Sequence, residues 1–388
     1  MANTLTALIP SLYASLDIIS RELVGAIPCA TMDASVSRAA VGQLVTTFVS
    51  PIGVATDITP GVTPPNDGDQ SIGNVQLTIT KSRRVPFRWN GEEELSMNNG
   101  GPGAKAIKTT QMAQAMRTLV NEMEADTVNA IRLASSRAYG TAGATPFASG
   151  LGDPAQLRKI LDDNGAPMND RCLLIDTSAG AALRTLAQLT KANEAGTTLT
   201  MREGQLLDLH NFSVHETAGI KSNLNGTMAG ATTNAAGYAA GATQITLATA
   251  GTGLVFAGSI ITFAGDANKY VVESVQFAGA NPAAGDKVVI AAPGLRNAIG
   301  TAATAITVGA AYTGNIGFSR SSLVLATRAP ALPDGGDLAV DRMTITDVRS
   351  GISFEVAMYA QYRQMQYEVS AAWGVKGIKS AHSAILLG

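Results

Sequence analysis

The sequence predicts an α+β protein whose main domain is divided by an insertion, and three observations carry this prediction. Residues 104–139 contain neither Gly nor Pro and predict one long helix. Strand and helix patterns alternate through residues 150–225, and strand patterns return from residue 316. Between them, residues 226–315 change to a composition dominated by Gly, Ala and Thr. We therefore expect an all-β domain inserted into a larger α+β domain.

The composition allows a multidomain protein and argues against strong binding to nucleic acid. The 388 residues have room for two or three domains, and the 46% apolar fraction is enough for sizeable cores. Charged residues make up only 15%, well below the usual quarter. The formal net charge is −2, with no strong basic patch for phosphates. A surface so poor in charge is expected where much of it is buried against neighbours.

The long helix is predicted over Lys105–Tyr139. Breaker residues at 98–103 precede it, and Gly140 and Gly143 follow it. Its apolar residues recur at steps of three and four: Met112, Met116, Leu119, Val120, Met123, Ala130, Ile131 and Ala134. A helix of this length runs roughly 50 Å, so we expect a spine to which separate parts attach. The alternative is an ordinary amphipathic helix in a helical domain.

A charged segment precedes this helix. In residues 74–96, apolar residues alternate with polar ones on both sides of Arg83-Arg84, and Asn90-Gly91 is a tight-turn pair. Three acidic residues, Glu92 to Glu94, follow the turn. We expect a hairpin arm that reaches a neighbouring subunit and meets opposite charge there. The alternative is a solvated hairpin with balanced charge.

The insertion, residues 226–315, holds only six charged residues. They are Asp266, Lys269, Glu273, Asp286, Lys287 and Arg296. Five β-prone runs recur at 244–247, 259–263, 270–275, 287–290 and 305–308, separated by turns. This pattern predicts a small β-barrel or sandwich. A disordered low-complexity linker is the alternative.

No motif for catalysis, cofactors or metals is present. The chain lacks a phosphate-binding loop, a nucleophile elbow and a dinucleotide fingerprint. Cys29 and Cys172 show no metal-ligand spacing, so a reduced, intracellular chain is expected, and His215-Glu216 does not continue into a zinc-protease motif. No apolar run approaches 18 residues, and residues 1–30 lack the basic start of a signal peptide. We expect no catalytic, cofactor or metal site and no membrane span.

The two ends of the chain carry a family resemblance. The start is MANTLTALIPSLYASLDIISRELVGAIPCA, followed by Arg38–Gln43, and the close runs from Trp373 to Leu387. With the order of parts above, the chain resembles the major capsid (coat) protein of tailed bacteriophages, which has the Hong-Kong-ninety-seven fold. It looks closest to the P-twenty-two-like coat proteins, which carry an inserted β-barrel.

The resemblance implies a division of the chain into six parts. They are an N-terminal arm (1–54), an extended hairpin loop (55–102), the spine helix of the peripheral domain (103–149), a first part of the axial and peripheral core (150–225), the inserted barrel (226–315) and a second part of that core (316–388). Contacts between subunits are expected at Arg83, Arg84, Arg88, Glu92, Glu93, Glu94, Asp266 and Lys269. Some relatives crosslink a Lys to a neighbour's Asn, and no such pair is expected here.

The function implied by the resemblance is structural, not enzymatic. The subunit would form pentamers and hexamers of an icosahedral shell that encloses double-stranded DNA without sequence-specific binding. Its partners would be further copies of itself, a scaffolding protein, a portal protein and a decoration protein. It would reside in the host cytoplasm during assembly and in the virion afterwards. The alternative is a bacterial surface or adhesion protein built on the β-rich region; an enzyme is a third hypothesis.

Overall fold

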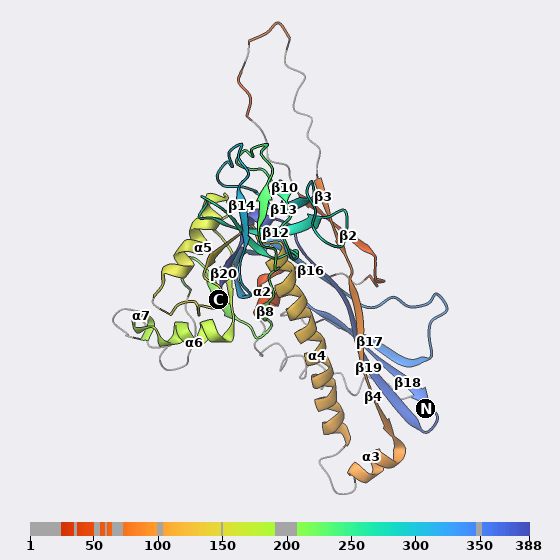
Figure 1. Ribbon diagram of the computed structural model, residues 1–388. Helices are drawn as coiled ribbons and strands as arrows, with labels where there is room; N and C mark the ends of the chain where they lie inside the picture. Colours follow the sequence, from red (N-terminus) through yellow and green to blue (C-terminus); the bar gives the residue numbers. More distant parts are fainter. Residues whose placement is uncertain are drawn as a thin grey trace.

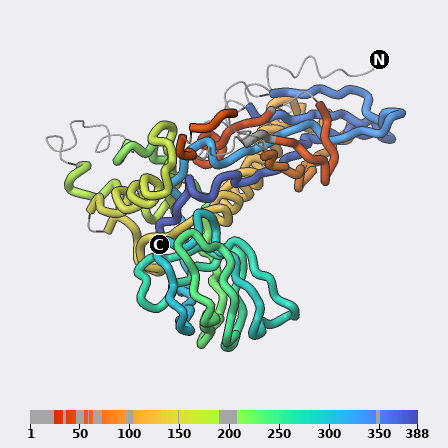
Figure 2. Tube along the Cα trace, turned by 90° about the horizontal axis from the view of Figure 1, so that it is seen from above, coloured from red at the N-terminus to blue at the C-terminus, as the bar shows by residue number. Residues whose placement is uncertain are grey.

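The computed structural model describes residues 25–34, 37–49, 55–58, 60–63, 73–98, 104–148, 150–190, 208–346 and 351–388. An elongated part built around helix α4 and a compact part around helices α5 and α6 lie end to end, and the strands of the insertion project to one side (Figures 1 and 2). Residues 1–24 of the expected N-terminal arm lie outside the described residues.

Helix α4 (Ala104–Leu133) has 30 residues and is about 45 Å long. Most of the predicted apolar stripe is buried: Met112, Met116, Leu119, Val120, Met123 and Ile131. One polar residue departs from the prediction. Glu124 is not among the apolar residues of the predicted stripe, yet it is only 3% exposed.

The predicted helix ends six residues too late. After Leu133 the chain leaves the helix, and Arg137–Gly140 forms strand β5. The Ser136 amide and its hydroxyl both donate to Ser383 O, at 3.0 and 2.8 Å, and β5 then pairs in parallel with β20 (Ser383–Leu387). Pairing with a distant strand overrides the local helical pattern, because tertiary contacts outweigh helix propensity.

The first sheet packs along α4 (Figure 1). Its order is β1 (Thr31–Ala34), β16 (Leu323–Arg328), β19 (Gln364–Gly377), β18 (Ser353–Gln361) and β17 (Ala339–Thr346), with β4 (Lys81–Asn90) also paired to β19. The short helix α2 (Ala26–Cys29) joins the same core. Apolar side chains of α2, α4 and this sheet thus form one hydrophobic core.

The predicted hairpin over residues 74–96 is not a hairpin. Strand β3 (Gly73–Thr78) pairs with β2 (Leu44–Val49), whereas β4 pairs with β19. The pair Asn90-Gly91 starts helix α3 (Gly91–Asn98) instead of a turn. The acidic run explains the difference, because carboxylates in the first turn stabilise a helix N-terminus.

The second sheet forms the compact part. This part of the sheet has the order β7 (Ser213–Glu216), β6 (Arg171–Ile175), β15 (Tyr312–Ser319), β20 and β5, with β8 (Ser222–Asn223) beside β15, and it continues from β5 into the strands of the insertion. Helices α5 (Gly152–Asp163) and α6 (Thr177–Thr185) bury their apolar faces on it, and α7 (Ala187–Thr190) follows. The succession of α5, β6 and α6 fits the alternation predicted for residues 150–225, and the side chain of Asp176 caps α6.

The insertion forms a closed ring of strands. They are β9 (Ala231–Thr233), β10 (Gln244–Thr249), β11 (Ile260–Phe263), β12 (Lys269–Gln276), β13 (Lys287–Ile290) and β14 (Ala305–Val308). Pairing of β11 with both β14 and β12 closes the ring, which encloses its own apolar core. The five β-prone runs of the sequence are β10 to β14. Closure leaves no unpaired edge in this ring.

Candidate functional site

The basic residues predicted at subunit contacts lie on β4. Arg83, Arg84 and Arg88 are exposed there. Two of them already have acidic partners in the same chain: Arg84 Nη1 lies 2.7 Å from Glu368 Oε2, and Arg83 Nε lies 3.4 Å from Glu122 Oε1. The positive charge on β4 is therefore partly balanced within the chain. The charge of Arg88 is more available to another chain than the charges of Arg83 and Arg84.

The acidic residues Glu92 to Glu94 occupy the first turn of α3. Asn90 Oδ1 accepts from Glu93 N at 2.8 Å, and Glu93 Oε2 accepts from Asn90 N at 3.1 Å. This reciprocal pair satisfies two amides at the start of the helix. Glu94 pairs with Lys108, so this ion pair joins α3 to α4. Glu92 remains exposed.

The strand edge beside these residues is open. Within the described residues, β4 pairs only with β19, and β17 pairs only with β18. Pro86 fits such an edge, since proline has no amide to donate. Unpaired edges are ready to pair with another chain, and charged residues on them restrict which chain does so.

Several large apolar side chains are exposed. They are Ile58, Val62, Leu95, Leu338 and Tyr362, with Ile58 at 97% and Tyr362 at 89%. Tyr362 is in the turn between β18 and β19 and lines a shallow groove with residues at the start of α3. The subunit thus presents apolar side chains that its own core does not cover.

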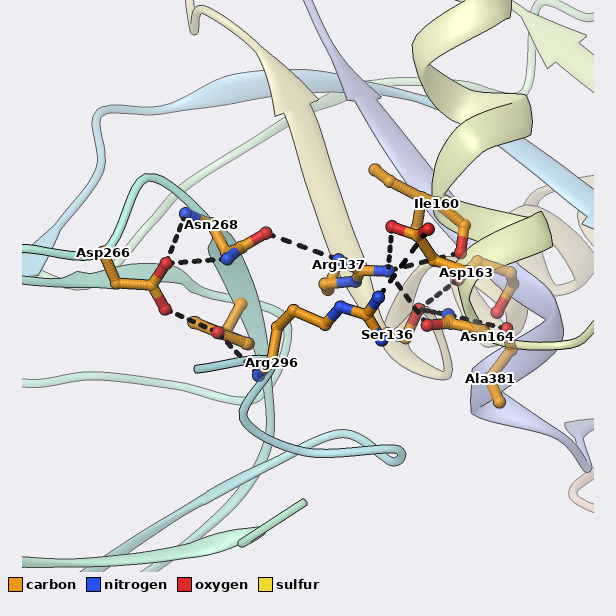
Figure 3. Close-up of polar contacts among 11 residues, drawn as sticks. Ser136, Arg137, Ile160, Asp163, Asn164, Asp266, Asn268, Arg296 and Ala381 are labelled. Carbon is orange, nitrogen blue, oxygen red and sulfur yellow. Dashed lines mark hydrogen bonds and ion pairs between the residues drawn. The ribbon is translucent and has the colours of Figure 1, made fainter. Parts of the chain in front are cut away.

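Asp266 and Lys269, the other predicted contact residues, lie where the barrel meets the compact part. Asp266 accepts from Tyr270 Oη at 2.6 Å and from the Asn268 side chain and backbone (Figure 3). It also accepts from Asn297 Nδ2 at 3.0 Å. Burial acts to raise the pKa of Asp266, and these hydrogen bonds outweigh it and lower that pKa. Burial raises the pKa of Tyr270 to about 12. Lys269 Nζ donates to Gly140 O.

Arg137 joins the barrel to helix α5 (Figure 3). Its guanidinium donates to Asn268 Oδ1 of the barrel at 3.3 Å and to Asn164 Oδ1 after α5 at 3.0 Å. It also lies 3.6 Å from Asp163 Oδ2. Burial lowers the pKa of Arg137, and Asp163 partly offsets that effect. The pattern of the sequence missed this residue because it placed Arg137 in the long helix.

Glu124 is a second residue that the sequence did not single out. Its carboxylate accepts from three successive backbone amides, Gly25, Ala26 and Ile27, at 2.9, 2.7 and 3.0 Å. It also accepts from Thr217 Oγ1 at 2.7 Å. Helix α4 thereby holds the start of α2 with a buried carboxylate, and the four donors compensate the loss of water.

The two cysteines of the chain meet a histidine beside α2. Ligand atoms of Cys29, Cys172 and His215 lie within 4.8 Å of one another. A hydrogen bond between the two thiol groups raises the pKa of Cys29, whose burial adds to the effect, and lowers the pKa of Cys172. Burial lowers the pKa of His215, which favours the neutral imidazole. Spacing along the chain gave no signal for this cluster.

Comparisons with known proteins give weak structural likenesses. No family model and no curated protein matches the chain. A structure described as Mycobacterium phage Che8 is 9% identical with a TM-score of 0.45, covering 90% of this chain and 88% of that one. The capsid structure of Cyanophage P-SCSP1u is 10% identical with a TM-score of 0.48, covering 92% and 86%. A virus-like particle from Pyrococcus furiosus is 10% identical with a TM-score of 0.42, covering 97% and 96%.

These TM-scores lie under 0.5, so the function proposed below depends on the sequence and geometry of this chain. In the described residues, no helix is both long enough and apolar enough to cross a bilayer.

Proposed function

We propose that this chain is the major capsid subunit of a tailed bacteriophage. Copies of it assemble as pentamers and hexamers into an icosahedral shell that encloses double-stranded DNA. The subunit has no catalytic role in this proposal. The resemblance of its two ends to tailed-phage coat proteins supports the assignment, and so does the order of its parts.

The observation that carries the proposal is the incomplete surface of the elongated part. Strands β4 and β17 each have one open edge within the described residues. The exposed Leu338 directly precedes β17, and the exposed Tyr362 lines a groove with the last residues of β4. A subunit of a closed shell needs surface that only its neighbours cover. Repeated head-to-tail contacts then close into rings, and many weak contacts per subunit add up to a stable particle.

Charge supports the same function. With a net charge of −2, the chain lacks the excess of basic residues that holds phosphates. A wall around DNA confines it without strong binding, because strong binding would impede its entry and exit. We therefore propose that the DNA is enclosed without sequence-specific contacts.

The parts of the chain take the roles that the resemblance implies. Residues 1–54 form an N-terminal arm and 55–102 an extended loop over an adjacent subunit. Residues 103–149 carry the spine helix, and 150–225 with 316–388 form the axial and peripheral core. Residues 226–315 form the inserted barrel. Scaffolding, portal and decoration proteins are the proposed partners, with assembly in the host cytoplasm and final residence in the virion.

Negative-stain electron microscopy of the purified recombinant protein tests the proposal. The protein is imaged alone and with a co-expressed scaffolding protein. We expect round shells, or open sheets and tubes of hexameric units. A uniform monomer under both conditions would refute the capsid function.

Charge reversal on β4 tests the proposed contacts. Arg83→Glu with Arg84→Glu is expected to reduce assembly while the subunit stays folded. Because both arginines also have partners in their own chain, Arg88→Glu is the sharper variant: the described residues hold no ion-pair partner for it. Lys159→Glu on the exposed face of α5 is a matched reversal outside the predicted contacts. Normal particles from Arg88→Glu would remove Arg88 from the proposed interface.

Expression of residues 226–315 alone tests the inserted barrel. The closed ring and its own core favour independent folding. We expect a β-type circular dichroism spectrum with a cooperative melt, and a disordered spectrum would reject an independent domain.

A further inference from the structure

Three separate segments bring soft metal ligands to one place. Cys29 ends helix α2, Cys172 lies in strand β6, and His215 lies in the neighbouring strand β7. The chain has only two cysteines, 143 residues apart (172 − 29), and both belong to this cluster. Within the described residues, this is the one group of three such side chains with ligand atoms close enough to share an ion.

The spacing suits a tetrahedral ion. With metal–sulfur bonds of about 2.3 Å and metal–nitrogen bonds of about 2.0 Å, ligand atoms around zinc lie about 3.5–3.8 Å apart. The ligand atoms here lie within 4.8 Å of one another, so shifts of about 1 Å complete the geometry. Side-chain rotations supply shifts of that size without a change of fold.

The ligand set selects the metal. Two thiolates and one imidazole suit Zn²⁺, whereas Mg²⁺ and Ca²⁺ prefer oxygen ligands. Cys29 and Cys172 are 1% and 8% exposed, so the sulfurs lie away from water. Three protein ligands leave a fourth position for water or another donor.

The surroundings hold the ligands in position. Ser213 Oγ lies 3.2 Å from His215 Nε2 and restrains the imidazole ring. Glu124 binds the amides that begin α2, and Arg320 Nε donates to Ala30 O, the residue after Cys29, at 3.3 Å. Both ends of α2 are thus fixed by contacts that need no metal, which places the Cys29 thiol over β6 and β7.

We propose that Cys29, Cys172 and His215 bind one Zn²⁺ per chain and that the ion joins α2 to strands β6 and β7. The site lies inside one subunit and is independent of the capsid proposal. It would secure α2 to the core that it shares with α4 and the first sheet. Shell assembly and zinc binding are therefore tested separately.

The test uses the full chain, purified with reductant and no metal-binding tag, stripped with a chelator and titrated with Zn²⁺. We expect one zinc per chain by mass spectrometry of the metal content. Replacing Zn²⁺ by Co²⁺ should give the visible absorption of a tetrahedral thiolate complex. His215→Gln, which keeps both cysteines, should weaken binding at least about tenfold, and Cys29→Ser and Cys172→Ser should do the same. His210→Gln changes an exposed histidine nearby and should bind as the wild type does.

Circular dichroism of each stripped variant shows whether it is folded, and zinc should raise the melting temperature of the wild type but not that of His215→Gln. Absence of bound zinc in the reduced wild type would overturn the proposal. Equal zinc affinity of His215→Gln and the wild type would also overturn it. So would a Cys29–Cys172 disulfide, found by peptide mass spectrometry, in freshly isolated protein.

Discussion

Replacing Glu124 by Gln should destabilise the subunit although the side chain keeps its size. The carboxylate is 3% exposed and accepts four hydrogen bonds, three of them from the backbone of residues 25–27. A hydrogen bond to a charged group contributes about 1.5–3 kcal/mol, and a buried donor left unpaired costs about 1–3 kcal/mol. Glutamine removes the charge and turns an NH₂ group toward at least one donor. We expect a loss of about 2–4 kcal/mol, and about 3–5 kcal/mol for Glu124→Ala.

Urea unfolding of the unassembled subunit measures this loss. Trp373 belongs to the same core as α2 and α4, so tryptophan fluorescence reports on the affected region. With a slope of about 3 kcal/mol per molar urea, Glu124→Gln should lower the midpoint by roughly 1 M. Glu273→Gln changes an exposed glutamate and should stay within about 0.5 kcal/mol of the wild type.

Hydrogen exchange supplies the local readout. The amides of Gly25, Ala26 and Ile27 donate to Glu124, so they should exchange much faster in Glu124→Gln than in Glu273→Gln. If the midpoint and the protection of these amides both match those of the control, the buried carboxylate does not hold α2 and the reasoning fails.

Three further predictions concern the barrel junction and the first sheet. Arg137→Ala removes a buried guanidinium and takes a charged donor from the half-buried side-chain oxygens of Asn164 and Asn268, so it should cost about 2–4 kcal/mol. Amide exchange in β5 and β12 should become faster, and unchanged exchange there would contradict the role of Arg137. Because folding lowers the pKa of Asp266, this carboxyl stabilises the fold at pH values above its unfolded pKa near 4, and the stabilisation is lost as the pH falls through its pKa in the folded protein. The urea midpoint should therefore drop more between pH 6 and pH 3 in the wild type than in Asp266→Asn. Equal drops would refute this. A Cβ at Gly374 would lie 2.2 Å from Thr78 O, so Gly374→Ala should lower the free energy of unfolding by about 1–3 kcal/mol. A Cβ at Gly335 would have nothing within 4 Å, so the melting temperature of Gly335→Ala should match that of the wild type.

The local sequence pattern was sufficient to predict those helices and strands that pack against any apolar surface. The β-prone runs of the insertion are strands, and the stripe from Met112 to Ile131 faces the core. Both follow from periodicity, because alternation or steps of three and four put apolar side chains on one face. The predictions failed where a distant segment decided the outcome. Arg137 continues a helical pattern but lies in a strand beside β20, and residues 74–96 pair with two different partners.

The residues of the candidate sites divide in the same way, into those found from local patterns and those brought together by distant segments. The exposed charges of β4 and α3 were found from sequence because charge runs and turn pairs are local signals. Glu124 is a charged residue outside the predicted apolar stripe, and nothing near it in the sequence indicates that it meets the amides of residues 25–27. Cys29, Cys172 and His215 gave no motif, because their ligand atoms converge from segments far apart in the chain.

The sequence by itself determined the α+β class, the long amphipathic helix, the charge-poor β insertion and the low net charge. Each depends on composition or on the period of nearby residues. Only the tertiary structure decided where α4 ends, which strands pair with β4, how the barrel closes and which buried polar groups meet. Those outcomes depend on hydrogen bonds and packing between residues distant in sequence, and their free energy outweighs local preference.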